Sequence, residues 1–351
     1  MTPNAVQGMG AAGNTGASIY SNQNRKKYIV LAILFAVCAV SLIADVMTGA
    51  AMLPVSDVLA CLFRRSTAPA TTQVIVWEMR LPIALMALAV GFALGSSGAV
   101  MQTILHNPLA SPYTLGVGAG ASFGASLAIV LGLGEAGICV CAFAFAMLIC
   151  LLIYCMGRLR SVSANSMVLS GIALLFLFQA LLALIQYGAS ESQNQSIVFW
   201  SFGSLQRTTW PRLAIAAATA AVIFPLLMQD SWKYTALLMG DEKAESLGIR
   251  VNRLKLKAFF LISLLSAISV CFTGTIGFIG LAGPHIARML VGEDQRFYIP
   301  VSAACGMVLL SIASILSKLI VPGTIFPIGI ITSIIGVPFF FALVMRGKGG
   351  R

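Results

Sequence analysis

The chain consists of long apolar stretches separated by short polar segments. A helix that crosses a bilayer needs about 20 mostly apolar residues, and nine stretches come close to this length. They fall near residues 28–48, 81–101, 113–133, 136–157, 165–187, 211–229, 254–274, 299–320 and 326–345. This pattern predicts an all-α polytopic membrane protein.

The positions of the basic residues require a tenth crossing. Lys and Arg gather on the cytoplasmic side of membrane proteins, and here they cluster at 25–27, within 233–257 and at 346–351. Six predicted spans separate the first two clusters, which leaves both on one side, but only three separate the second cluster from the third. A further crossing must therefore follow the second cluster, where residues 258–287 carry no charged side chain. This topology places both termini in the cytoplasm.

We assign the tenth crossing to Thr275 through Arg288, within "TGTIGFIGLAGPHIARMLVGEDQR". A helix of this length spans about 21 Å, less than the hydrocarbon thickness of about 30 Å. Non-helical backbone at membrane depth must be buried in protein or line a cavity. The residues that can supply such breaks are Gly274, Gly277, Gly280, Gly283 and Pro284. Steps of three residues spread these glycines around the helix, which favours a broken or closely approached backbone over a single packing face. The alternative is that Gly is simply common in membrane helices.

The first half of the chain contains a similar interruption. Residues 95–126 follow a predicted span and combine several glycines with Asn107 and Pro108. Paired segments of this kind in two halves of a chain are typical of transporters whose pathway runs between structural repeats. We therefore expect about ten transmembrane helices, with two related halves and short broken helices.

Composition and charge support the membrane assignment and divide the chain into three parts. Hydrophobic residues make up 59% of the chain and charged residues only 9%, against about a quarter charged in soluble domains. The net charge of +11 does not indicate nucleic acid, because the 22 Lys and Arg end apolar segments and form no basic stripe. Residues 1–27 are polar and predicted to be a disordered cytoplasmic tail. Residues 28–346 form the ten-helix domain and 347–351 a short cytoplasmic tail.

The chemistry that the sequence lacks narrows the class of function. The interiors of the spans carry almost no ionisable residues, which argues against an ion-coupled secondary transporter, although backbone carbonyls could still bind Na⁺. No GxxxxGK[ST] phosphate loop occurs, so energy for uphill transport must come from another subunit. His106 and His285 lie far apart and form no metal motif, so neither a metal site nor an enzyme is predicted.

The most highly charged loop, at about 238–257, is a candidate contact for a partner. Asp241 can cap a short helix, Glu242 suits its first turn, and Gly248 can end it in a left-handed conformation. Ala244 and Leu247 would then form a small apolar knob on that helix. A partner groove could hold such a knob, but a solvated connector explains the sequence equally well.

Several stretches, in order along the chain, match one transporter family. They are "MRLP" (79–82), "SGAVMQTILHNPLASPYTLGVGAGASFGA" (97–125), "NSMVLSGIAL" (165–174), "FWSFGSL" (199–205), "GDEKAESLGI" (240–249), "GTIGFIGLAGPHIARMLVGEDQR" (274–296) and "FPIGIITSIIGVPFF" (326–340). With these residues the chain resembles the permeases of FecCD-like, type II ATP-binding-cassette (ABC) importers, which take up ferric siderophores, haem and cobalamin. The resemblance extends from about residue 28 to 346.

The resemblance implies ten helices, a homodimer of permeases, two cytoplasmic ATPase subunits and an external substrate-binding protein in the cytoplasmic membrane. ATP and Mg²⁺ would bind to the ATPases, and this chain would hold no cofactor. The matching positions imply that the ATPase-coupling loop uses Asp241, Glu242, Ala244, Leu247 and Gly248. They also imply that the translocation pathway is lined by Met167, Ser170 and Gly171.

The resemblance further implies that basic residues on the outer rim dock the binding protein. Arg80 matches one such position. The second is usually the Arg of an Asp-x-x-x-Arg pattern, where this chain has Ser314 and Lys318. Within the family the resemblance favours an iron chelate, in particular a ferric siderophore, while haem, cobalamin or an oxyanion stay open as substrates.

Overall fold

The structure is a computed structural model that describes the backbone of residues 3–49, 51, 53–63, 69–159, 164–320 and 323–347. Every regular element in this part of the chain is helical. Seven helical segments are long and apolar enough to cross a membrane, and three shorter apolar helices accompany them. The expected fold class, an all-α polytopic protein with short helices, is therefore confirmed.

The long helices that supply these spans are α1 (Pro3–Met47), α4 (Leu81–Ile104), α6 (Gly134–Leu159), α7 (Ala164–Gly188), α9 (Trp210–Met228), α12 (Val251–Thr273) and α14 (Gln295–Leu319). The three helices with short apolar spans are α5 (Val117–Val130), α13 (Ile279–Val291) and α15 (Ile328–Gly347). The connecting helices are α2 (Val55–Phe63), α3 (Ala70–Gln73), the π-helix η2 (Val74–Arg80), α8 (Glu191–Ser201), the 3₁₀-helix η3 (Leu205–Arg207), α10 (Ser231–Leu237) and α11 (Asp241–Ser246).

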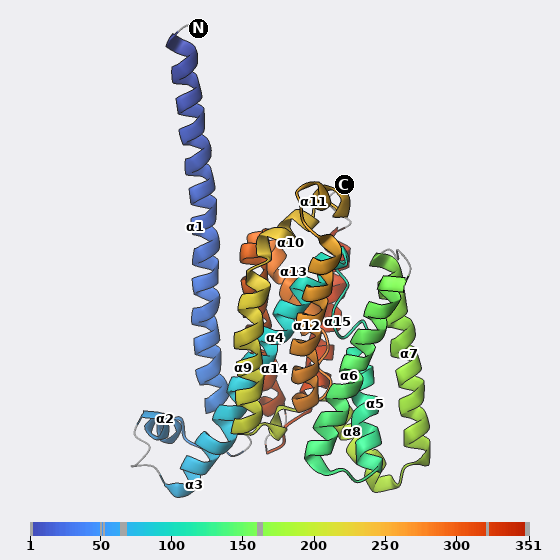
Figure 1. Cartoon of the computed structure of the whole chain (residues 1–351). Coiled ribbons are helices and arrows are strands. Elements are labelled where there is room, and N and C mark those ends of the chain that lie inside the picture. Colours follow the sequence, from blue (N-terminus) through green and yellow to red (C-terminus); the bar gives the residue numbers. More distant parts are fainter. Residues whose placement is uncertain are drawn as a thin grey trace.

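The start of α1 and the end of α15 lie toward the same end of the bundle as α10 and α11 (Figure 1), which we call the α11 end. The opposite end, which carries α2, α3 and α8, is the α8 end. Lys27 lies 3.7 Å from Asp294, so the first basic cluster meets the start of α14 at the α11 end. This arrangement agrees with the charge parity that required an even number of crossings.

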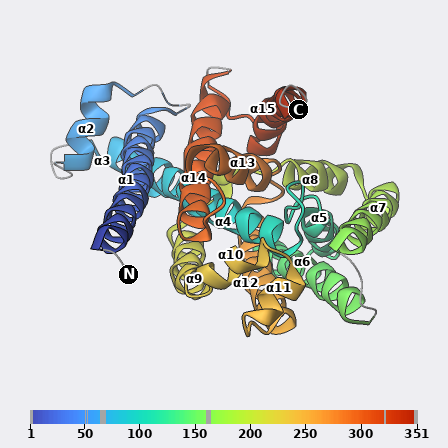
Figure 2. The same ribbon diagram turned by 90° about the horizontal axis from the view of Figure 1, so that it is seen from above.

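Helices α4, α12 and α14 form the centre of the bundle (Figure 2). In the apolar stretch of each of these spans, 78%, 67% and 61% of the residues are buried, against 22% in α1 and 11% in α7. Helices α1 and α7 therefore lie at opposite margins, where they present apolar side chains to their surroundings.

Helices α4 and α14 touch backbone to backbone. A Cβ atom added to Gly91 would collide with the backbone of Gly306, and one added to Gly95 would collide with that of Ser302. Small residues four positions apart allow such an approach, and helix association in lipid depends on this close packing. The contact joins helices more than 200 residues apart in the sequence and sets the position of both.

Helix α13 is the short crossing, but its bounds differ from the prediction. It runs from Ile279 to Val291 rather than from Thr275 to Arg288, and its 13 residues correspond to about 20 Å. Residues 274–278 precede it as non-helical backbone. This segment is held against residues 201–204, because Thr275 donates its side-chain hydroxyl to the Ser201 carbonyl and Ser204 N donates to the carbonyl of Thr273, the last residue of α12, at 2.6 Å.

Helix α5 is also shorter than the sequence predicts. The expected span at 113–133 begins as turns, and helical geometry starts only after Gly116, which has φ +83°. The reason is local turn chemistry: Ser111 N donates to Thr114 Oγ1 at 2.9 Å and Thr114 N donates to Ser111 Oγ at 3.1 Å, and such side-chain bonds to the backbone favour a turn over a helix. The two interrupted segments therefore both contain a short helix preceded by irregular backbone.

The N-terminal segment also differs from its prediction. Helix α1 begins at Pro3, whereas the composition predicts a disordered tail over residues 1–27. Once the span that follows has nucleated a helix, each further residue extends it at the cost of ordering only that residue. Of the predicted tail at 347–351, all but residue 347 lies outside the described residues.

We expect the α4–α14 contact to tolerate no side chain. Gly91→Val should lower the free energy of unfolding by about 1–3 kcal/mol, because overpacking forces the two backbones apart. Gly188→Val at the end of α7 is the matched control, since nothing lies within 4 Å of its added Cβ. Thermal unfolding of the purified protein in detergent measures both, and equal melting temperatures for the two variants would contradict the close contact.

Candidate functional site

The loop at 238–257 forms an exposed structure at the α11 end. Helix α11 begins after Gly240, which has φ +101° and occupies the N-cap position. Asp241 was predicted as the cap but is the first residue of the helix and makes no capping bond. Its carboxylate instead accepts hydrogen bonds from Lys255 Nζ at 2.6 Å and His106 Nε2 at 3.1 Å. Hydrogen bonds to an ionised carboxylate are among the strong ones, so these partners fix the Asp241 side chain.

The partners of Asp241 also determine its protonation. Partial burial raises the pKa of this carboxyl, but hydrogen bonds from Lys255 and His106 outweigh burial and leave the pKa below its ordinary value. A carboxyl with a lowered pKa stabilises the folded state above its unfolded pKa of about 4 and loses that contribution as the pH falls further. Asp241 is therefore ionised at neutral pH and holds α11 in place.

The exposed surface of α11 differs from the predicted apolar knob. Ala244 is fully buried and accepts a backbone hydrogen bond from Ile249, so it packs inward. Leu247 is 53% exposed, and Glu242 lies exposed on the same short helix. Gly248 has φ +81°, which confirms the left-handed conformation expected after the helix. The surface open to a partner is thus one leucine beside acidic residues, because Ala244 anchors the helix to the bundle.

One polar link connects this loop to the interior, and a second connects the preceding helix α10. The first runs from Asp241 through His106 into residues 105–116, the irregular segment that leads to α5. The second runs from Thr235 of α10 to Gln295 N at 3.1 Å, and from Gln295 Oε1 to Thr103 of α4 at 3.1 Å. No sequence pattern revealed these links, because the partners are more than 50 residues apart and each is an unremarkable polar residue alone.

The structure brings the two interrupted segments together. A Cβ on Gly277 would lie 3.2 Å from the ring of Tyr113, and one on Gly118 would lie 3.3 Å from Thr275. The Tyr113 and Phe278 rings lie 6.5 Å apart. The irregular backbone of each half therefore packs against that of the other half.

The remaining predicted backbone positions each meet a different neighbour. A Cβ on Gly280 would lie 3.2 Å from the Leu94 carbonyl of α4, and one on Gly283 would lie 3.2 Å from the Ser302 carbonyl of α14. Gly274 has φ +74°. Pro284 lies inside α13, and Pro108 lies in the turn that Asn107 begins. The glycines thus contact several helices, as expected for residues spread around a helix.

The predicted pathway residues pack within the chain. Gly171 of α7 is buried against Leu115, whose backbone leaves no room for a Cβ. Ser170 donates its hydroxyl to the Ser166 carbonyl of its own helix at 2.8 Å. Met167 packs against the main hydrophobic core. Gly171 therefore serves the contact between α7 and the segment before α5, and the lining role of the three residues stays a prediction.

The two predicted docking cations point inward, contrary to the expectation of a basic outer rim. Arg80 is 5% exposed and donates to the carbonyls of Val46, Met47 and Ala51, the first two at 3.1 and 3.0 Å. It therefore satisfies the carbonyls that the end of α1 leaves free. An exposed docking role is inconsistent with this placement.

Lys318 is buried as well, because it neutralises an acid on another helix. Its Nζ lies 2.6 Å from Asp45 Oδ1, and the side chains are 3% and 0% exposed. Ser314, which stands where the family has an acid, donates to the same oxygen at 2.9 Å. Asp45 of α1 thus supplies the carboxylate that α14 lacks.

Loss of one partner of this pair should destabilise the protein strongly. Asp45→Asn leaves Lys318 buried without a counter-charge, which costs about 3–5 kcal/mol. The double variant Asp45→Leu with Lys318→Met removes both charges and should recover most of that loss. Thermal unfolding in detergent distinguishes the cases, and a single variant as stable as the wild type would show that the pair is not buried.

We also expect Asp241 to hold α11 and residues 105–116 together. Asp241→Asn should increase hydrogen–deuterium exchange in both segments, since the amide cannot replace the charge-assisted bonds. Glu245→Gln is the control, because Glu245 is an exposed acid on the same helix. Exchange measured by mass spectrometry checks this, and unchanged exchange at residues 105–116 would show that the link is not structural.

Comparison with known proteins gives relatives of almost the same length. One relative, from Methanocaldococcus jannaschii, is named as a putative ABC transporter permease protein. It is 37% identical over 93% of this chain and 97% of its own length. A second, named as a probable iron chelatin transport system permease protein of Helicobacter pylori, is 37% identical over 79% of this chain and 84% of its own length.

A solved structure shares the fold. It is described as an inward-facing conformation of a putative metal-chelate type ABC transporter. The match has a TM-score of 0.79 and 29% sequence identity, and it covers 90% of this chain and 99% of that chain. The model of the FecCD transport family matches residues 23–346. Through this match and the similarity of the relatives, the chain belongs to the FecCD transport family and is a permease subunit of an ABC importer.

Proposed function

We propose that this permease moves a ferric chelate, of the siderophore class, inward across the cytoplasmic membrane. The Helicobacter pylori relative is named for an iron chelate, and the solved structure is described as a metal-chelate transporter. Two partner ATPases supply the energy at the α11 end, and an external binding protein delivers the chelate at the α8 end. Both termini then lie in the cytoplasm.

The observation that carries this proposal is the exposed helix α11. Leu247 and Glu242 are open to a partner while Ala244 anchors the helix. A short, rigidly held helix with an exposed leucine suits a hydrophobic groove on an ATPase. The acidic first turn would give that contact its orientation.

A second copy of the chain would complete the pathway. The margin formed by α7 exposes large apolar side chains, including Phe176 at 64% and Leu184 at 68%. In the chain alone such side chains face lipid, and a homodimer would enclose some of them around a central passage. An apolar passage binds a large chelate weakly, so recognition would reside mainly in the binding protein.

Force on α11 would reach the bundle through its polar links. Movement of Asp241 pulls on His106 and residues 105–116, while Thr235 transmits to Gln295 at the start of α14. Because α4 and α14 are in backbone contact, they would move as one body. Rigid-body rocking of this kind gives alternating access.

Reversal of charge on α11 should uncouple transport. We expect Glu242→Arg to reduce ATP-dependent uptake at least about tenfold, because a disrupted interface contact of about 1.4 kcal/mol already corresponds to that factor. Lys243→Gln, on the same exposed helix, should stay within about twofold of the wild type. Uptake of ferric siderophore, haemin and cobalamin into proteoliposomes that contain the ATPase and the binding protein measures the effect and the substrate class.

Two results would contradict the proposed function. One is full uptake by Glu242→Arg with normal ATPase assembly, which would remove α11 from the coupling contact. The other is uptake by the chain alone under an ion gradient, without an ATPase, which would make the protein a secondary transporter. A preference for haemin or cobalamin would change the substrate and leave the coupling scheme intact.

A further inference from the structure

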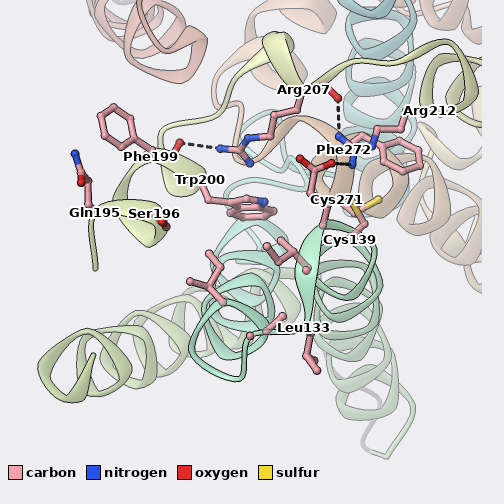
Figure 3. A pocket seen from close by; sticks show the side chains of 16 residues that line it. Leu133, Cys139, Gln195, Ser196, Phe199, Trp200, Arg207, Arg212, Cys271 and Phe272 are labelled. Atoms are coloured by element: carbon pink, nitrogen blue, oxygen red, sulfur yellow. Dashed lines mark hydrogen bonds and ion pairs between the residues drawn. The ribbon is translucent and has the colours of Figure 1, made fainter. Parts of the chain in front are cut away.

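A cavity at the α8 end belongs to none of the sites described above. It has a volume of about 560 Å³ and lies between α8, the turn from α5 to α6, η3 and the ends of α9 and α12 (Figure 3). Pockets for small molecules in proteins typically have volumes of about 300–1,000 Å³. The cavity is therefore large enough for a small ligand.

Two arginines contribute to this cavity, and only one has its charge balanced. Arg212 lies 2.7 Å from Glu135 and also donates to the Arg207 carbonyl at 2.6 Å. Arg207 donates through Nη2 to the Phe199 carbonyl at 3.0 Å, and its guanidinium lies 5.8 Å from the centre of the Trp200 ring. In the described part of the chain no carboxylate lies within 4.0 Å of Arg207.

The second nitrogen of Arg207 is unpaired. Nη1 is buried and has no hydrogen-bond partner among the described residues. Burial also lowers the pKa of Arg207 below its ordinary value. A carbonyl and an aromatic ring are neutral groups that leave most of the cost of a partly desolvated charge in place. Among the described residues, the cavity therefore holds two arginines and one carboxylate, Glu135, which is paired with Arg212, so one positive charge is left without a paired anion.

The rest of the lining indicates what kind of anion fits. The walls are mainly apolar and aromatic, with Phe199, Trp200, Phe272 and Leu133, and the polar side chains of Gln195 and Ser196 lie on α8 at one side. Figure 3 shows Arg207 reaching from η3 toward α8, beside Trp200. This arrangement suits a molecule with one charged group and an apolar body.

We propose that this cavity binds an amphipathic anion, with a carboxylate or phosphate group on Arg207 and its apolar part against Trp200 and Phe199. Guanidinium groups bind both of these anions through paired N–H donors. Two sources share this chemistry: the headgroup of an anionic phospholipid and a carboxylate-bearing small molecule at the α8 end. The site does not depend on the proposed substrate or on ATP coupling.

The test uses the purified full-length chain in detergent and two probes, short-chain phosphatidylglycerol and citrate. Binding is followed by Trp fluorescence, with Trp200→Phe to assign the signal, and by the rise in melting temperature that a ligand of the folded state produces. Arg207→Gln removes the charge but can still donate to the Phe199 carbonyl. Arg25→Gln removes the same charge from an exposed position on α1.

We expect at least one probe to bind saturably, with an affinity that Arg207→Gln lowers about tenfold or more and that Arg25→Gln changes less than twofold. Arg207→Lys should retain part of the affinity because it keeps the charge. Dependence of the phosphatidylglycerol signal on Arg207 identifies a lipid site, and dependence of the citrate signal identifies a carboxylate site. Without a probe, Arg207→Gln should melt no lower than the wild type.

Three results would overturn the proposal. The first is that neither probe binds with an affinity that depends on Arg207. The second is an equal loss of affinity in Arg25→Gln, which would indicate general surface attraction. The third is a large drop in the melting temperature of Arg207→Gln without a probe, which would assign the arginine to the structure of the chain.

Discussion

The backbone contact between α4 and α14 is the interaction on which the remaining structure depends. Gly91 and Gly95 of α4 meet Gly306 and Ser302 of α14 with no space for a side chain between them. Lipid offers no hydrophobic driving force for helix association, so such close van der Waals packing is what holds helices together in a membrane. Helix α13 rests on the same pair, because a Cβ on Gly98 would collide with the backbone of Gly280.

The irregular backbone before α13 is enclosed by other parts of the chain. The segment after α8 lies against it, because a Cβ on Gly203 would collide with the Thr275 carbonyl. The same segment binds the start of α15, where Ile328 N and Gly329 N donate to the carbonyls of Gly203 and Phe202, each at 3.1 Å. Residues 202–204 thus join the break before α13 to the start of α15. Arg207 and the cavity beside it lie next to this junction, so a bound anion would contact the same region that supports the break.

Polar contacts are distributed unevenly along the bundle. At the α11 end, Asp241 and Gln295 connect the exposed loop to α4, α14 and the segment before α5. In the spans, the pair of Asp45 and Lys318 is buried and self-neutralising. Ionic contacts at both ends, such as Asp241 with Lys255 and Glu135 with Arg212, and close glycine packing in the middle are suited to helices that move as rigid bodies.

The sequence by itself determined the membrane class, the nine long apolar stretches, the short tenth crossing near residue 280 and the even number of crossings. These follow from local hydrophobicity, glycine content and charge position, which need no partner in space. Only the tertiary structure decided that Ala244 faces inward, that Asp241 binds His106, and that Arg80 and Lys318 are buried. The contacts of Arg80, Asp241 and Lys318 span 29 to 273 residues. The role of such a side chain is set by the neighbour that folding brings to it, which the pattern along the chain does not contain.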